Sequence, residues 1–296
     1  MPSAQTESPS RWAYVAMAFN LVAWGLSWVN VRAIVREVGP GELGAMRYLI
    51  ASAVITIVWL VRGRPLPARR DVPGVVLLGI FGFTLYNLGI NYGEVTVDAG
   101  TGAMLISCVP VLVMATGVAL RRETVTPWGW LGFLVAMLGV AFTSGVLENG
   151  VTLNLGTLLI LGSALCATVQ TMLSKALTQR YAAVDVTTWA IWVGTLALLP
   201  FAHGIGDVAA RLSPGAWGHL VFLGVVPAAL CYSLWAWVLQ SLPMTFVMAS
   251  VYIMPMFSVL FAWVILGEIP PSSSLVGGLI TLGGVALVQR LGRPPA

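Results

Sequence analysis

Ten apolar stretches follow one another along the chain, separated by short connectors that carry Gly, Pro and charged residues. A helix needs about 20 mostly apolar residues to cross a bilayer, so each stretch predicts one membrane span. Backbone groups in lipid must be satisfied internally, which favours a helix bundle. The pattern predicts an all-α polytopic membrane protein with ten transmembrane helices. The predicted spans are residues 12 to 35, 42 to 61, 72 to 93, 99 to 120, 127 to 147, 155 to 177, 186 to 206, 216 to 239, 244 to 266 and 272 to 289.

The composition excludes a soluble globular protein and some kinds of partner. Of 296 residues, 58% are hydrophobic and only 9% are charged, whereas roughly a quarter of a soluble domain is charged. The three cysteines are an odd number and lie in apolar stretches, which argues against a disulfide framework. The net charge of +4 is spread over the connectors without a polybasic tail. We therefore expect contact with membrane lipids and none with nucleic acid.

The basic residues predict how the chain is oriented in the membrane. If the N-terminus is cytoplasmic, the outer face carries only Arg32, Arg36 and Arg211. Cytoplasmic loops usually hold the excess of Lys and Arg, so both termini are expected in the cytoplasm. The inner face then carries Arg11, Arg62, Arg64, Arg69, Arg70, Arg121, Arg122, Lys175, Arg180, Arg290 and Arg293.

A shift of 145 residues aligns residues that shape the backbone in the two halves of the chain. The shift spans five helices, an odd number, so the second half must be inverted relative to the first. We predict two inverted five-helix repeats, residues 1–147 and 148–296, around a central cavity, as in many transporters. The shift pairs Gly79 with Gly224, Pro110 with Pro255, Glu123 with Glu268, Gly132 with Gly277 and Gly139 with Gly284.

The acidic residues avoid the predicted spans. A carrier coupled to protons or Na⁺ usually keeps an Asp or Glu in mid-membrane. The sequence therefore predicts a facilitator, or a carrier whose proton coupling does not use a membrane carboxylate. All eleven acids lie in connectors or at span ends: Glu7, Glu37, Glu42, Asp71, Glu94, Asp98, Glu123, Glu148, Asp185, Asp207 and Glu268.

No set of residues predicts catalysis, a cofactor or a metal. His203 and His219 flank one connector without the spacing of metal ligands, which is typical of polar loop residues. His, Asp and Glu do not converge within any span, as hydrolysis would require. The sequence therefore predicts that the protein is not an enzyme.

Arg47 is the one charged residue that lies well inside a predicted span and away from its ends. Counted from the outer end of the second helix, it lies roughly 8 Å deep at 1.5 Å per residue. Its side chain could reach the interface and tether the helix. Alternatively, its guanidinium could hold a substrate carboxylate or gate the outer mouth. Transport by Arg47→Lys distinguishes these interpretations, because tethering tolerates lysine.

Polar and aromatic residues within the spans are the candidates for a substrate-binding cavity. In the first helix they share one face, because their spacings are four, seven and eight. Polar residues also bridge helices and tryptophans also pack in cores, so each residue alone has a structural alternative. As a set they favour a cavity whose rings suit an amphipathic or aromatic solute. The set is Asn20, Trp24, Ser27, Trp28, Tyr86, Asn87, Asn91, Ser107, Gln170, Tyr232, Trp235, Ser250 and Tyr252.

Three prolines lie near the middle of predicted spans. Pro110 and Pro255 are equivalent under the 145-residue shift, and Pro227 corresponds to Gly82. Proline removes a backbone donor and kinks a helix. The kinks could give the cavity a fixed curvature, or they could act as paired hinges for alternating access.

A set of motifs is spread over nearly the whole chain: Ala23-Trp24-Gly25, Met46-Arg47-Tyr48, Leu78-Gly79, Tyr86-Asn87, the segment from Ala103 to Glu123 with Pro110, and its second copy from Met248 to Glu268. In these motifs the chain resembles the drug/metabolite transporter superfamily in its ten-helix EamA-type branch, and within it the YddG-type amino-acid exporters. This resemblance implies export of aromatic and other neutral amino acids from the cytoplasm across a bacterial inner membrane.

The expected function is therefore alternating-access export of amino acids and related amphipathic metabolites, by a chain that acts as a monomer. A multidrug exporter of lipophilic aromatic cations is the alternative within transporters. The lack of a buried carboxylate counter-ion argues against it. A lipid flippase is a further alternative, and it would show no saturable flux of amino acids.

Overall fold

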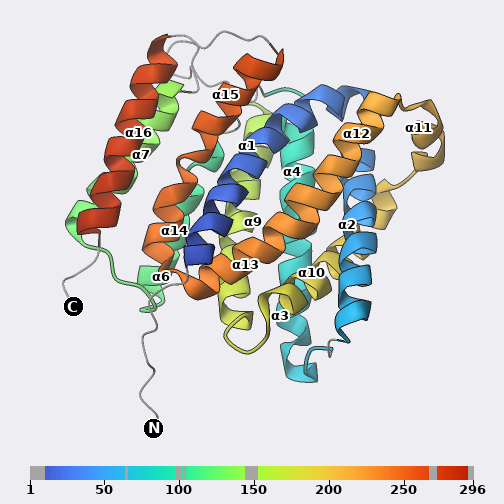
Figure 1. The fold of residues 1–296 in the computed structure, drawn as a ribbon, viewed down its shortest axis with the longest axis horizontal. Coiled ribbons are helices and arrows are strands. Elements are labelled where there is room, and N and C mark those ends of the chain that lie inside the picture. The colour runs from blue at the N-terminus through green and yellow to red at the C-terminus, as the bar shows by residue number, and fades with distance from the viewer. Residues whose placement is uncertain are drawn as a thin grey trace.

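The computed structural model describes residues 11–63, 66–97, 102, 105–143, 153–266 and 272–292, and the regular elements in them are all helical (Figure 1). The first half contains α1 (Arg11–Val38), α2 (Pro40–Arg62), η1 (Arg69–Asp71), α3 (Val72–Gly79), η2 (Ile80–Leu85), α4 (Tyr86–Gly93), α6 (Val109–Ala119) and α7 (Pro127–Thr143). The second half contains α9 (Leu155–Leu177), α10 (Ala183–Leu198), η3 (Leu199–Phe201), α11 (Ile205–Arg211), α12 (Pro214–Leu223), η4 (Gly224–Cys231), α13 (Tyr232–Ser241), α14 (Met244–Val251), α15 (Met254–Leu266) and α16 (Ser272–Leu291).

The helices carry the apolar surface expected of a membrane protein. Large apolar side chains point outward, with Val61 83% exposed and Leu279 72% exposed. The predicted all-α polytopic membrane fold is confirmed, while the number of ten crossings stays a prediction. Three shorter apolar helices are Val109–Ala119, Pro127–Phe142 and Val276–Leu291. Within the described residues, seven helical segments are long and apolar enough to span: Arg11–Val35, Pro40–Val61, Arg69–Gly93, Leu155–Leu177, Ala183–Phe201, Pro214–Ser241 and Met244–Ile265.

Several long helical segments are interrupted at positions that correspond under the 145-residue shift. The π-helical stretch η2 interrupts one segment and the π-helical stretch η4, which contains Pro227, interrupts the other. Turns at residues 107–108 and 252–253 precede α6 and α15, whose second residues are Pro110 and Pro255. The interruptions match in position, while the division of the chain into two inverted repeats stays a prediction.

The helices α7 and α16 pack closely side by side at one edge of the bundle (Figure 1). A Cβ added at Gly139 would lie 2.7 Å from the carbonyl oxygen of Gly277. A Cβ added at Gly284 would lie 2.7 Å from the carbonyl oxygen of Gly132. Only residues without side chains allow backbones to approach this closely. The 145-residue shift converts one contact into the other, because it pairs Gly139 with Gly284 and Gly132 with Gly277. Such a reciprocal contact is expected where a pseudo-twofold axis relates two elements.

The segment from η1 to α4 runs from Arg69 to Gly93. Asp71, near its start, lies about 33 Å from its end at 1.5 Å per helical residue. We call the two ends of the bundle the Asp71 end and the Glu94 end. At the Asp71 end, Arg180 Nη1 donates to Asp71 Oδ1 at 2.6 Å and the Tyr181 hydroxyl donates to Oδ2 at 2.7 Å. Lys175 forms an ion pair with Glu123.

The structure corrects what the positions of the acidic residues imply about their exposure. Those in the described residues do lie at helix ends, but Asp71 is only 6% exposed and Asp185 only 5% exposed. A position at a helix end does not imply contact with water, because neighbouring helices extend past it. Glu7, Asp98, Glu148 and Glu268 lie outside the described residues.

Candidate functional site

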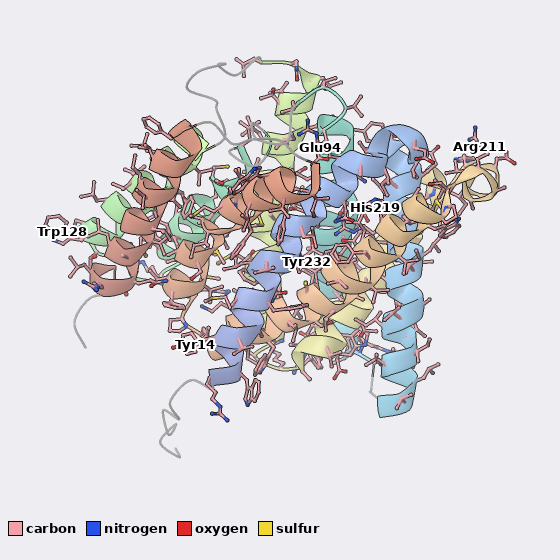
Figure 2. All side chains as sticks on the ribbon, turned by 45° about the horizontal axis from the view of Figure 1, so that its top comes forward. Tyr14, Glu94, Trp128, Arg211, His219 and Tyr232 are labelled. Atoms are coloured by element: carbon pink, nitrogen blue, oxygen red, sulfur yellow. The ribbon has the colours of Figure 1, made fainter. Side chains whose placement is uncertain are left out.

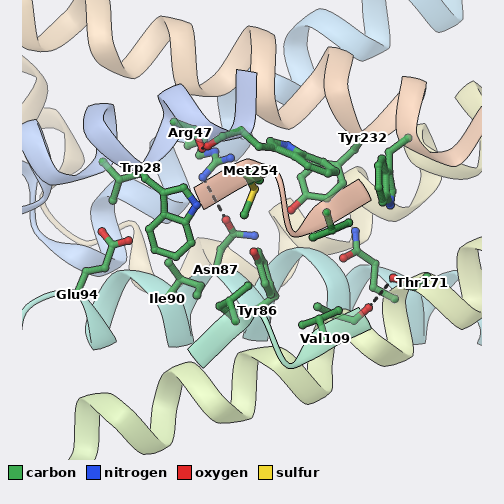
Figure 3. Close-up of a pocket in the computed structure, with 18 of the residues that line it drawn as sticks. Trp28, Arg47, Tyr86, Asn87, Ile90, Glu94, Val109, Thr171, Tyr232 and Met254 are labelled. Atoms are coloured by element: carbon green, nitrogen blue, oxygen red, sulfur yellow. Dashed lines mark hydrogen bonds between the residues drawn. The ribbon is translucent and has the colours of Figure 1, made fainter. Parts of the chain in front are cut away.

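A cavity of about 120 Å³ lies among α1, α2, α4, α6, α9, α13, α14 and α15 (Figure 3). For comparison, an engineered apolar cavity of about 150 Å³ binds benzene, so this cavity is close to the size of an aromatic ring. Nine of the residues predicted from the sequence line it: Trp24, Ser27, Trp28, Arg47, Tyr86, Asn87, Gln170, Tyr232 and Trp235.

The other predicted binding residues lie outside this lining. Asn20 is fully buried, and its amide atoms have no hydrogen-bond partner within the described part of the chain. Asn91 Nδ2 donates to the carbonyl of Pro40 and joins α4 to α2. Ser250 donates to the carbonyl of Phe246, one turn back in its own helix.

Two further predicted residues lie in the core beside the cavity. Ser107 is 4% exposed and lies in the turn before α6, next to the lining residue Ile106. Tyr252 is 1% exposed and packs on Phe133, with ring centroids 6.3 Å apart. The prolines Pro110, Pro227 and Pro255 contribute no lining surface and shape the backbone around the cavity.

Aromatic rings form one wall of the cavity. The Trp24 centroid lies 5.0 Å from that of Trp235 and 5.5 Å from that of Tyr232. Tyr232 also meets Phe83 edge to face at 4.8 Å. Trp24 Nε1 donates to the carbonyl of Pro227 at 3.4 Å, which fixes the indole against η4. Such a wall suits the flat or apolar part of a solute.

Arg47 is buried in the bundle, 7% exposed, and its guanidinium does not reach the interface as the tethering interpretation requires. Its Nε donates to the carbonyl of Leu223 at 3.2 Å. Pro227, four residues later, has no N–H for that carbonyl in α-helical register, and the arginine side chain donates to it at the start of the π-helical stretch η4. Arg47 Nη1 donates to Asn87 Oδ1 at 3.3 Å, and Asn87 Nδ2 donates to the Tyr48 hydroxyl at 2.9 Å.

Glu94 is the charged lining residue that was not among the candidates from the sequence. Part of its side chain is exposed, but both carboxyl oxygens are buried and have no hydrogen-bond partner in the described residues. Burial raises the pKa of Glu94 to about 8, against the opposing charges of Arg47 and Arg32. Glu94 follows Asn87 by seven residues, so helical spacing puts both on one face, and that signal could have found it.

Glu94 lies near one end of the bundle and Tyr232 near its middle (Figure 2). A smaller cavity of about 10 Å³ continues toward the Asp71 end, where Leu78 and Ser174 line it. Gln170, Tyr232 and Trp235 line both cavities. These side chains therefore narrow any path between the main cavity and the Asp71 end.

The described residues contain no group of three His, Cys, Asp or Glu side chains placed to hold a metal ion. The arrangement brings together an aromatic wall, one guanidinium and one carboxyl group. Such a site can bind a small amphipathic solute with charged groups, since its rings take the apolar part and its two charges take polar groups.

Comparisons with known proteins point the same way. The model of the EamA-like transporter family matches residues 11–145 and 154–290. A probable terminal-alkyne amino-acid exporter of Streptantibioticus cattleyicolor is 31% identical over 281 residues, covering 94% of each chain. The uncharacterized transporter YdfC of Bacillus subtilis is 29% identical, covering 88% of this chain and 86% of its own. One crystal structure, 19% identical, shares the fold with a TM-score of 0.73 and covers 94% of this chain and 99% of that chain.

Proposed function

The chain belongs to the EamA-like transporter family of the drug/metabolite transporter superfamily, and from this premise we propose that it exports aromatic and other neutral amino acids. The observation that carries the proposal is one cavity in which an aromatic wall lies beside a buried guanidinium and a buried carboxyl group. A neutral amino acid presents the complementary set, namely an apolar side chain, a carboxylate and an ammonium group. The relative named as an amino-acid exporter supports this substrate class.

Export by alternating access requires the cavity to open at each end in turn. The narrowing at Gln170, Tyr232 and Trp235 and the ion pair of Glu123 with Lys175 would close the Asp71 end. The turns before Pro110 and Pro255 would supply the hinges. The protein would act as a monomer in the bacterial inner membrane, with both termini and the Asp71 end in the cytoplasm.

The first experiment is counterflow in proteoliposomes with labelled L-phenylalanine, L-tryptophan and L-alanine. We expect exchange that saturates, and Trp235→Leu should weaken exchange of the aromatic substrates several-fold, because it removes part of the wall. Trp263→Leu is the matched control, because Trp263 is 49% exposed on the outer surface. If none of these amino acids exchanged with the unmodified protein, the proposal would be wrong.

A second candidate function is export of aromatic cations. Glu94 favours it, because a buried carboxyl group beside tryptophan rings suits an organic cation. Arg47 opposes it, because a guanidinium in the same cavity repels a cation. Counterflow of a quaternary aromatic cation that exceeds counterflow of L-phenylalanine would favour this candidate.

The energy source can be tested in the same proteoliposomes. We expected transport without a coupling carboxylate because the acidic residues avoid the predicted spans. The carboxyl group of Glu94 is buried beside the cavity, so the positions of the acids no longer support that expectation. Uptake is measured with and without a pH gradient at equal substrate concentration. Uphill accumulation driven by the gradient would show that protons are coupled to transport.

A further inference from the structure

Building on the proposed function, we propose that Glu94 binds the ammonium group of the substrate while Arg47 binds its carboxylate, so that the cavity selects α-amino acids as zwitterions. Both residues line the same cavity. In the view of Figure 3, the Trp28 indole lies between Glu94 and the hydrogen-bonded pair of Arg47 and Asn87. The two charges therefore flank one ring of the lining.

The state of the Glu94 carboxyl group is the first argument. Both oxygens are buried without a hydrogen-bond partner in the described residues. Burying a polar group without a partner costs free energy, and burying a charge costs far more. A group kept in that state beside a cavity gains most from a ligand that supplies a donor and a positive charge, which an ammonium group does.

Arg47 supplies the second argument. A guanidinium has five N–H donors, and the hydrogen bonds formed in the described part of the chain use two of them, to Leu223 and to Asn87. These two bonds hold the group in place and leave donors for a substrate carboxylate. The fixed planar fork of arginine matches a carboxylate in geometry.

Two opposite charges in one cavity restrict the substrate class. A zwitterion satisfies both groups, whereas a simple acid leaves Glu94 unpaired and a simple amine leaves Arg47 without a carboxylate. A ligand that leaves one of these two groups unmatched binds more weakly, because the desolvation of that group is not compensated. The aromatic wall of Trp24, Tyr232 and Trp235 then ranks amino acids by their side chains.

The binding step also moves one proton. The charged or titratable groups that face Glu94 are Arg32 from α1, Arg47 from α2 and Tyr86 from α4. Because its pKa is raised to about 8, Glu94 holds a proton at neutral pH when the cavity is empty. When an ammonium group binds, the carboxylic O–H bond breaks, the carboxylate pairs with the ammonium, and the proton passes to water.

The test is calorimetric binding of L-phenylalanine and phenethylamine to the purified full-length protein and to Glu94→Gln. We expect the variant to bind both ligands about 10- to 100-fold more weakly, the range for hydrogen bonds to charged groups. The unmodified protein should release close to one proton per ligand at pH 7, measured in two buffers of different ionisation enthalpy, and the variant should release none. Glu37→Gln is the matched control at an exposed position.

Each outcome decides between the inference and the proposed function. Unchanged affinities in Glu94→Gln, or no binding of either ligand to the unmodified protein, would overturn the inference. Binding of phenethylamine that depends on Glu94, without counterflow of L-phenylalanine, L-tryptophan or L-alanine, would keep the ammonium site and overturn the amino-acid function. Thermal unfolding of Glu94→Gln must match that of the unmodified protein, and if it does not, Glu94→Asp is used, with weakened but proton-releasing binding expected.

Discussion

Arg47 makes two hydrogen bonds within the protein, and the proposed site uses the same guanidinium for the substrate carboxylate. Its Nε donates to the Leu223 carbonyl, for which Pro227 has no N–H in α-helical register, and its Nη1 donates to Asn87. A lysine has one ammonium group on a flexible stem and cannot reproduce two directed bonds from a planar fork. The side chain is therefore oriented before any substrate arrives.

We expect Arg47→Lys to weaken L-phenylalanine binding about 10-fold, because a charged hydrogen bond to the substrate carboxylate is lost. Phenethylamine has no carboxylate, so its affinity should change less than twofold. Calorimetry measures both affinities. Arg211→Lys, on the exposed helix α11, is the control. Equal losses for both ligands would instead indicate a general structural defect at Arg47.

The pH dependence of binding follows from Glu94. Phenethylamine stays positively charged below pH 9, since aliphatic amines have pKa values of about 10. The raised pKa of Glu94, about 8, means that binding must displace a proton at lower pH. Affinity should therefore fall about tenfold for each pH unit below 8. In Glu94→Gln the profile between pH 6 and pH 8 should be flat, and a slope that survives in this variant would exclude Glu94 as the titrating group.

Residue patterns predicted much of the cavity and missed its acid. Trp24, Ser27 and Trp28 share a helix face, and that face does line the cavity. Glu94 follows the end of an apolar run, where a sequence alone cannot distinguish an acid in the headgroups from one covered by neighbouring helices. Glu94 shares the cavity lining with residues of α1 and α2, which lie far from it in the sequence.

At the scale of the element, apolar length predicted where helices begin and end, but it could not predict how they are interrupted. The second span was expected over residues 42 to 61, and α2 covers Pro40–Arg62. The π-helical stretches η2 and η4 are as apolar as their flanks, so hydropathy contains no sign of the changed hydrogen-bond register. Pro227 was the only local clue, and η2 contains no proline.

Pro227→Ala tests how η4 positions the arginine. The new N–H would donate to the Leu223 carbonyl in α-helical register and compete with Arg47 Nε. We expect L-phenylalanine affinity to fall about 2- to 10-fold, equivalent to about 0.5–1.5 kcal/mol, because Arg47 loses one of the two hydrogen bonds that orient it. Thermal stability should not fall. Pro214→Ala, at the first residue of α12, is the control. Lower stability with unchanged affinity would show that the proline serves packing alone.

At the scale of the whole molecule, the contact between α7 and α16 relates the two halves. Gly139 meets the Gly277 carbonyl and Gly284 meets the Gly132 carbonyl, so helices that correspond under the shift pack through corresponding residues. A sequence alone predicted the correspondence but not the contact, because nothing in either helix specifies its partner. In an inverted duplication, the same interactions can close either end of the cavity, which is the basis of alternating access.

Opening of the Asp71 end should break the ion pair between Lys175 and Glu123, whose side chains are 28% and 17% exposed. A partly exposed pair contributes about 0.2 to 1 kcal/mol, so Glu123→Gln should raise the population open at this end by up to about fivefold. The readout is the labelling rate of Ser174→Cys, in the smaller cavity, by an impermeant maleimide in a background without the three native cysteines. Asp207→Asn, on exposed α11, should leave the rate unchanged. Because the pair is weak, transport should persist in Glu123→Gln, and an unchanged labelling rate would mean that the pair does not hold this end closed.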